Sequence, residues 1–254
     1  MAGLRMPAMT MARPQGEEAG QQSTARQKNA AFFADNAAYK SAQKRLETYR
    51  YIALAASHET ADSRALLDIG NGGVFEYPIG HIQRIVAIDV FVEKDFAERY
   101  PHVEWRQVSA LEMDFRERFD TVIAVNTLHH IVGPSVRATY ANLAEFMKRT
   151  TGCLCEDGKL VVIESTMPKW FVRLYSWCFP LVLALWPLSH PPTFQFHFRD
   201  IVSAAEQAGL SLREFTWIPK TSDVLFLGWQ IKSWMVPIRI GKFVFAPSVE
   251  RGRS

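Results

Sequence analysis

The sequence predicts an α/β domain built around a mostly parallel sheet. Short runs rich in β-branched and aliphatic residues alternate with segments long enough to form helices or compact loops. The runs 65–70, 84–90 and 120–126 are apolar with little alternation, which is typical of strands buried on both faces. Strands that alternate with helices favour a parallel sheet, because parallel neighbours need a crossover connection.

The composition fits one well-filled α/β domain or one domain that carries an inserted lid. The chain has 254 residues, of which 48% are hydrophobic and 22% are charged. The formal charge of +3 is small and the basic residues are scattered among acids, which argues against a nucleic-acid partner. Cys153, Cys155 and Cys178 suit a reducing cytoplasm and lack the second pair that a zinc site needs. We therefore expect a cytoplasmic protein without a metal ion.

Helices are expected before the first strand and between later strands. Residues 1–28 lack hydrophobic periodicity and predict a flexible tail, which leaves 29–254 as the domain. Residues 29–57 contain no Gly or Pro and space their larger apolar residues at helical intervals, so they predict a helical cover over the sheet. The segments 136–158 and 199–209 predict two further helices.

More strands are expected in the second half of the chain. The runs 103–108 and 158–166 are β-rich. The β-rich runs 211–219 and 223–234 are separated by a short linker, which is typical of an antiparallel hairpin. We therefore predict that these last two runs pair with each other.

The segment "LLDIGNGG", residues 66–73, runs from a buried strand into a glycine-rich turn. Such a strand is expected to present backbone N–H groups and a helix N-terminus to a ligand above the sheet. Asp68 favours a cationic or amine-bearing ligand group over a bare pyrophosphate. Asp89 ends the next strand 21 residues later, where such folds bind ribose hydroxyls, and Val90 and Phe91 follow it as packing partners for an adenine ring.

This turn resembles the first motif of the class I S-adenosylmethionine-dependent methyltransferases of the small-molecule type. The family motif is an acid followed by three glycines at alternate positions, and the chain supplies Asp68, Gly70 and Gly72. It departs from the motif at Val74, which replaces the third glycine, while Gly73 lies one residue early. A nicotinamide cofactor is disfavoured, because Gly-x-Gly-x-x-Gly read from the first glycine fails at its sixth position.

Four further segments match the family in the expected order, so the resemblance covers about residues 62–166, with a weaker match at 201–215. They are "AIDV", "QVSALEMDF", "FDTVIAVNTLHHI" and "LCEDGKLVVIEST". The resemblance implies a Rossmann-like, seven-stranded, mostly parallel sheet with an antiparallel last strand, helices on both faces and an N-terminal helical cover.

The resemblance also implies that S-adenosylmethionine is the cofactor. By it, Asp68 orders the methionine end, Asp89 binds the ribose, and Asn126 faces the methionine carboxylate or the sulfonium. The other implied cofactor contacts are Gly70 and Gly72 at the turn, Val90 beside the ribose acid, and Ala110 and Leu111 at the adenine.

His129 and His130 follow the fourth strand, on the rim where the acceptor is expected. A hydroxyl or a carbon acid benefits from a base, so the pair favours O-methylation over C-methylation, with a packing role as the alternative. His190 and Tyr39 are further candidates for contact with the acceptor; the alternatives are a rigid Pro-containing loop and a core tyrosine.

Residues 167–198 are expected to form a lid. The uncharged stretch 174–188 is too short, and too interrupted by Pro180 and Pro187, to cross a bilayer as a helix. Its tryptophans, including Trp177, favour contact with a hydrophobic or amphipathic acceptor such as a polyketide, terpenoid, quinone or lipid-like secondary metabolite. A homodimer interface, an extra core layer and peripheral membrane contact through 170–190 stay open, as does a non-catalytic cofactor-binding or scaffold role.

Overall fold

Within the described residues, seven strands form the central sheet. The computed structural model describes residues 46–185, 192–226 and 229–248. The strands of the sheet are β1 (Ala65–Ile69), β2 (Arg84–Asp89), β3 (Val103–Gln107), β4 (Phe119–Val125), β5 (Leu154–Thr166), β6 (Leu210–Trp217) and β9 (Arg239–Pro247). Their order is β3-β2-β1-β4-β5-β9-β6, and β9 runs antiparallel to both of its neighbours while the other pairs are parallel. The predicted sheet with an antiparallel last strand is confirmed.

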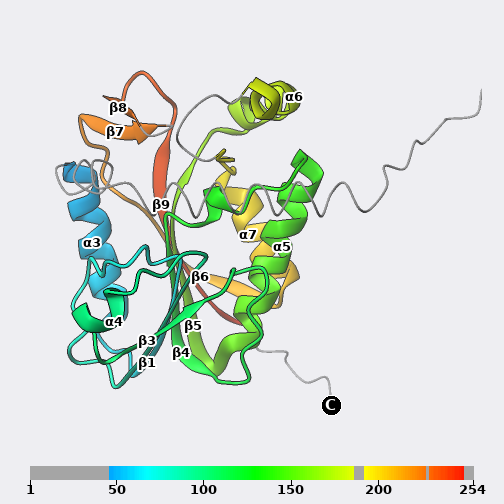
Figure 1. Cartoon of the computed structure of the whole chain (residues 1–254). Coiled ribbons are helices and arrows are strands. Elements are labelled where there is room, and N and C mark those ends of the chain that lie inside the picture. Colours follow the sequence, from blue (N-terminus) through cyan, green and yellow to red (C-terminus); the bar gives the residue numbers. More distant parts are fainter. Residues whose placement is uncertain (1–45, 186–191, 227–228, 249–254) are drawn as a thin grey trace, which may run out of the picture.

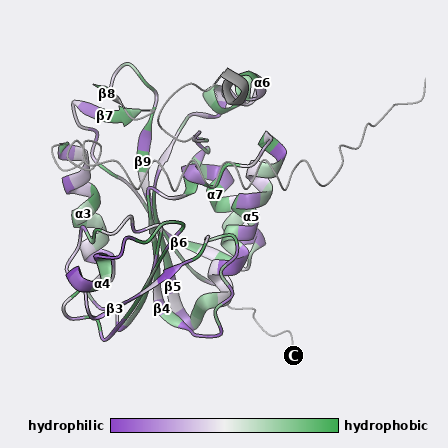
Figure 2. Cartoon of the chain, in the orientation of Figure 1, coloured by the Kyte–Doolittle hydropathy of each residue, from purple (hydrophilic) through white to green (hydrophobic). Residues whose placement is uncertain are grey.

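Helices cover both faces of this sheet (Figure 1). On one face lies α3 (Glu47–Thr60), and on the other lie α5 (Val136–Cys153) and α7 (Phe198–Gln207). The remaining helical elements are the single-turn α4 (Phe96–Arg99), the 3-10 helix η1 (Leu128–His130) and α6 (Lys169–Leu185). Both α3 and α5 mix hydrophilic and hydrophobic residues (Figure 2), as expected for helices with one side on a core.

The inner strands supply two apolar layers, one on each face of the sheet. Successive residues of a strand point to opposite faces. On β1, Leu66 therefore packs in the layer below α3, whereas Leu67 packs in the layer below α5. On β5, Val161 and Val162 divide in the same way. This double burial explains why the inner strands are apolar without alternation.

The chain end pairs differently from the prediction. β6 pairs with β9, and β7 (Asp223–Phe226) pairs with β8 (Trp229–Lys232) in a separate two-stranded sheet. The predicted hairpin between 211–219 and 223–234 is therefore wrong. The reason is burial, because β9 has five consecutive buried residues and brings Phe243 against Phe215 of β6, with ring centroids 4.9 Å apart.

The expected lid segment contains one continuous helix within the described part of the chain. Pro180 lies inside α6 and does not end it. Val172 and Phe179 on the inner side of α6 are buried in the apolar layer of α5. Among the described residues, no helix is long and apolar enough to span a membrane. The predicted tail 1–28 lies outside the described residues.

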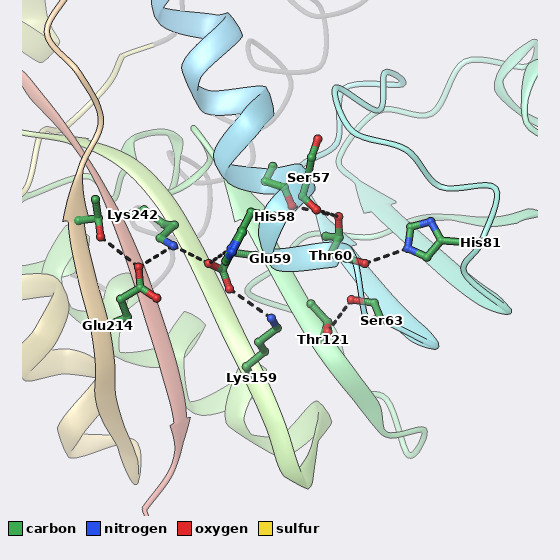
Figure 3. A network of polar contacts seen from close by, with 12 residues as sticks. Ser57, His58, Glu59, Thr60, Ser63, His81, Thr121, Lys159, Glu214 and Lys242 are labelled. Carbon is green, nitrogen blue, oxygen red and sulfur yellow. Dashed lines mark hydrogen bonds and ion pairs between the residues drawn. The ribbon is translucent and has the colours of Figure 1, made fainter.

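A buried ionic cluster ties α3 to the sheet (Figure 3). Glu59, near the end of α3, accepts hydrogen bonds from Lys242 of β9 and from Lys159 of β5, the latter at 3.2 Å. Lys242 also pairs with Glu214 of β6 at 2.8 Å. Burial alone would raise the pKa of Glu59, but its hydrogen bonds with Lys242, His58 and Lys159 outweigh it and lower the pKa to about 2.

We expect Glu59→Gln to lower the free energy of unfolding by about 2–3 kcal/mol at neutral pH, because Lys242 and Lys159 lose a buried partner. The lowered pKa means that this contribution is complete above pH 4.5 and is lost as the pH falls toward 2. Urea unfolding at several pH values should therefore show the difference shrinking under acid. The matched change Glu47→Gln, at an exposed site of the same helix, should cost less than about 0.5 kcal/mol. Equal losses in both variants would contradict the role of the cluster.

Candidate functional site

Three glycines after β1 hold the chain in a left-handed turn. Gly70, Gly72 and Gly73 have φ angles of 73°, 64° and 80°. A Cβ atom would lie 2.6 Å from the Thr127 side chain if added at Gly70, and 2.0 Å from the Phe96 ring if added at Gly73. A Cβ atom at Gly72 would meet no described heavy atom within 4 Å. Protein side chains therefore pack against the turn at Gly70 and Gly73, whereas the space above Gly72 is open.

The prediction of a helix directly after this turn is wrong. Residues 70–83, all of them described, contain no helix and lead to β2 through turns and loops. Pro78 and Gly80 disfavour a helix here. The ring of Phe75 instead packs beside those of Tyr100 and Trp105, at centroid distances of 5.1 and 5.8 Å.

This loop accounts for the departure at Val74. In dinucleotide-binding turns of similar design, the third glycine allows a helix to pack closely on its strand. No helix starts here among the described residues, so the position does not need a glycine. The conformational demand falls instead on Gly73, whose φ angle is 80° and which contacts the Phe96 ring.

Asp68 lies buried under the turn. Its Oδ2 accepts hydrogen bonds from the Tyr77 hydroxyl and from Asn71 Nδ2, both at 2.6 Å. Burial raises the pKa of Asp68 to about 6, against the opposing effect of these two hydrogen bonds, and the charge of Asp89 raises it further. The sequence-based reading missed Tyr77 and Asn71, although the place of Asn71 between two glycines was a usable signal.

Asp89 joins the end of β2 to the glycine turn. Its two carboxylate oxygens accept from the backbone N–H groups of Gly72, at 2.9 Å, and of Phe91, at 3.1 Å. The carbonyl of the adjacent Val90 accepts from Gln107 Nε2 at 3.2 Å. An acid is thus held at the same edge as the turn, as predicted from its spacing.

The ends of β3 and β4 complete this edge. Ala110 and Leu111, in the turn after β3, are partly buried against the apolar layer of α5. At the end of β4, Asn126 takes a left-handed φ of 51° and its N–H donates to the Ile163 carbonyl at 2.8 Å. Thr127 then donates its hydroxyl to the Ile69 carbonyl at 3.0 Å, which fixes the end of β4 against the glycine turn.

Beyond Thr127, His129 forms a buried pair with Glu164 of β5. Its Nδ1 lies 2.8 Å from Glu164 Oε1. The other oxygen, Oε2, accepts from the backbone N–H groups of Leu128 and His129 at 2.7 and 3.3 Å. The sequence-based prediction missed Glu164, because no spacing rule links a residue of η1 to a residue of β5 that lies 35 positions away.

The surroundings of Glu164 keep it ionised. Burial alone would raise its pKa, but the charge and hydrogen bond of His129, with the N–H and hydroxyl of Ser165, outweigh burial and place the pKa below its ordinary value. A carboxylate accepts only, so it fixes the hydrogen on Nδ1 of His129. The lone pair of Nε2 is then free to take a proton, and no described residue bonds to that atom.

The other predicted residues take no part in the hydrogen bond between His129 and Glu164, or lie outside the described residues. The His130 ring lies beside that of His129, with centroids 4.1 Å apart. Trp177 is on the outer side of α6 with 82% of its surface exposed, so its contact with an acceptor stays a prediction. Tyr39 and His190 lie outside the described residues.

Residues 67–162 match the family model for a methyltransferase domain. This part of the chain is a methyltransferase domain. The matched range includes the glycine turn, the acid at the end of β2 and the histidine pair. An edge with an open glycine turn and two acids fits S-adenosylmethionine as the cofactor. No curated protein matches the chain at a significant level.

Solved structures share the fold of this methyltransferase at low sequence identity. The N-methyltransferase NodS from Bradyrhizobium japonicum WM9, in complex with S-adenosyl-L-homocysteine, is 14% identical with a TM-score of 0.57, over 87% of this chain and 97% of that one. The geranyl diphosphate C-methyltransferase from Streptomyces coelicolor A3(2) is 10% identical with a TM-score of 0.56, over 88% and 97%. The 1,6-didemethyltoxoflavin-N1-methyltransferase from Burkholderia thailandensis is 14% identical with a TM-score of 0.53, over 97% and 94%.

We expect Gly73→Ala to destabilise the methyltransferase more than Gly72→Ala, by at least about 1 kcal/mol in the free energy of unfolding. Both changes strain a left-handed residue, but only the Gly73 change also drives a methyl group into the Phe96 ring. Adding Phe96→Leu should recover part of the loss in Gly73→Ala and none in Gly72→Ala. Chemical denaturation of the four variants measures this, and equal losses at both glycines would refute the packing explanation.

Proposed function

We propose that this methyltransferase transfers a methyl group to a small hydrophobic or amphipathic acceptor, with His129 as general base. The observation that carries the proposal is the buried His129–Glu164 pair, fixed beside the glycine turn through Thr127. When bound, the cofactor supplies an electrophilic methyl group on its sulfonium. The protein's own part is to hold the acceptor in line, exclude water and receive the acceptor's proton.

The pair is suited to proton removal from a hydroxyl. The proton passes from the acceptor oxygen to Nε2 of His129. Meanwhile Nδ1 retains its own hydrogen and its hydrogen bond to Glu164. The resulting imidazolium is stabilised by the buried carboxylate. O-methylation is therefore favoured. C-methylation is the alternative, because a C–H acid next to a carbonyl can use the same base.

The proposed apolar acceptor would lie near a chain segment beside His129 whose aromatic side chains Phe194 and Phe196 are buried in the core. The backbone N–H of Phe194 donates to the His129 carbonyl at 2.9 Å, and the carbonyl of Phe196 accepts from Met167 at 3.0 Å. The rings of Tyr140 and Tyr175 pack on Phe194 at centroid distances of 5.8 and 5.6 Å. Structural neighbours named for geranyl diphosphate and 1,6-didemethyltoxoflavin act on small molecules, which is in keeping with a polyketide, terpenoid, quinone or lipid-like acceptor here.

The cofactor is proposed to lie over the edge formed by β1, β2 and β4. Asp68 is assigned to its ammonium group, Asp89 to its ribose, and Asn126 to its carboxylate or sulfonium. The other proposed contacts are Gly70, Gly72, Val90, Ala110 and Leu111. Support comes from the open space above Gly72 and from the hydrogen bond that ties Gly72 to Asp89.

The test of the proposed reaction starts from metabolite extracts incubated with methyl-labelled cofactor, followed by mass spectrometry. With an acceptor in hand, His129→Ala should lower kcat by about 10²- to 10⁴-fold, the usual contribution of a general base, and leave the affinity for S-adenosylhomocysteine unchanged. Glu164→Gln should lower kcat by a smaller factor with little change in KM, because the base remains but its hydrogen-bonded orientation is lost.

His130→Ala is the matched control, because it removes the neighbouring imidazole and leaves the pair with Glu164 intact. Its kcat should stay within about tenfold of the parent. Thermal unfolding with and without S-adenosylhomocysteine verifies that every variant is folded. A fully active His129→Ala variant, or cofactor binding without methylation of any extract component, would overturn the proposal.

A separate prediction concerns the pH dependence of cofactor binding. Since the pKa of Asp68 is about 6, the carboxylate needed by the cofactor's ammonium is lost as the pH falls below that value. The affinity for S-adenosylhomocysteine should then weaken by up to about tenfold per pH unit below 6 and be nearly constant above 7. Isothermal titration calorimetry measures this. Asp68→Asn should bind weakly with a flat profile, and a sloping profile in that variant would show that another group titrates.

A further inference from the structure

The outer side of α6 is apolar although it faces solvent. Its opposite side, with Val172 and Phe179, is packed in the core. The solvent-facing side carries one stripe of large apolar residues at helical spacing. This outer stripe consists of Trp170, Leu174, Trp177 and Leu181, which are 62%, 54%, 82% and 60% exposed. The helix is therefore apolar on two opposite sides, and the core accounts for one of them.

A second exposed apolar site lies in the turn between β8 and β9. There, Trp234 and Met235 are 78% and 59% exposed. α6 and the β7–β8 sheet lie at the same end of the molecule, beyond the end of β5 (Figure 1). Of the seven large hydrophobic side chains exposed in the described ranges, six belong to the outer stripe or to this turn, and the seventh is Leu54 on α3. The exposed apolar surface is thus concentrated at one end.

The charges around the stripe are basic. α6 contains Lys169 and Arg173, both exposed, and its sequence has no acidic residue. Lys232 precedes the exposed turn, where it pairs with Asp223 at 3.0 Å. Tryptophan rings and lysine or arginine side chains along one helix face suit the boundary between acyl chains and anionic headgroups.

We infer that the outer stripe and the β8–β9 turn form a membrane-docking surface for an anionic lipid bilayer. α6 lies along the headgroup region, with its tryptophans inserted and Lys169 and Arg173 at the phosphates. It does not cross the bilayer, because it has 17 residues with a proline inside. Membrane docking by this surface is independent of the proposed reaction and does not depend on which acceptor is methylated.

Flotation of the full chain with liposomes tests the surface. The parent should float with phosphatidylcholine vesicles that contain phosphatidylglycerol and bind pure phosphatidylcholine vesicles much more weakly. The double variant Trp170→Ser/Trp177→Ser should lose at least about tenfold in partitioning to the anionic vesicles, and Trp234→Ser should lose less. Lys169→Gln/Arg173→Gln should weaken binding to the anionic vesicles alone, and added salt should have the same effect on the parent.

Leu54→Ser is the matched control, because it removes an exposed apolar side chain from α3 and should leave flotation unchanged. Affinity for S-adenosylhomocysteine should equal that of the parent in every variant, which separates this test from the proposed reaction. Absence of flotation by the parent would overturn the inference, as would equal losses in the Leu54 and tryptophan variants. Light scattering that shows a dimer broken by the tryptophan changes, without lipid binding, would assign the surface to a second copy instead.

Discussion

The buried carboxylate of Glu164 fixes the geometry on which the site depends. It accepts five hydrogen bonds, from the backbone N–H groups of Leu128, His129 and Ser165 and from the side chains of His129 and Ser165. An ionised carboxylate in a dry interior is tolerated only when it is satisfied in this way. Through these hydrogen bonds, Glu164 holds the turn after β4 against β5 and fixes the orientation of the His129 ring.

The glycine turn is held by side-chain packing where its motif predicted a helix. Phe96 closes the space behind Gly73, and the rings of Phe75, Tyr100 and Trp105 fill the region that leads to β2. The cofactor binding proposed at this turn therefore relies on the acids Asp68 and Asp89, without the dipole of a following helix. Burial raises the pKa of Asp68, and the hydrogen bonds from the neutral donors Tyr77 and Asn71 do not outweigh it.

The segment after β5 serves two surfaces at once. Val172 and Phe179 of α6 extend the core, and Phe194, which follows in the chain, belongs to the same core and donates its backbone N–H to the His129 carbonyl. The opposite side of α6 carries exposed tryptophans. A helix with apolar residues on two opposite sides is typical of an interfacial element, so the exposed side of α6 calls for a partner.

Local pattern in the sequence determined most of the framework. Buried strands, amphipathic helices and the spacing of Asp68 and Asp89 follow from periodicity and chain geometry, and the seven-stranded, mostly parallel sheet followed from the family motifs. Tertiary structure decided what local pattern cannot encode. The partner of β6 was chosen by burial of β9, and Glu164 met His129 because two parallel strands end side by side. Pro78 and Gly80 disfavour a helix after the glycine turn, and this signal is visible in the local sequence. The course of the loop was set by the packing of Phe75 on the distant rings of Tyr100 and Trp105, which no local stretch of sequence can show.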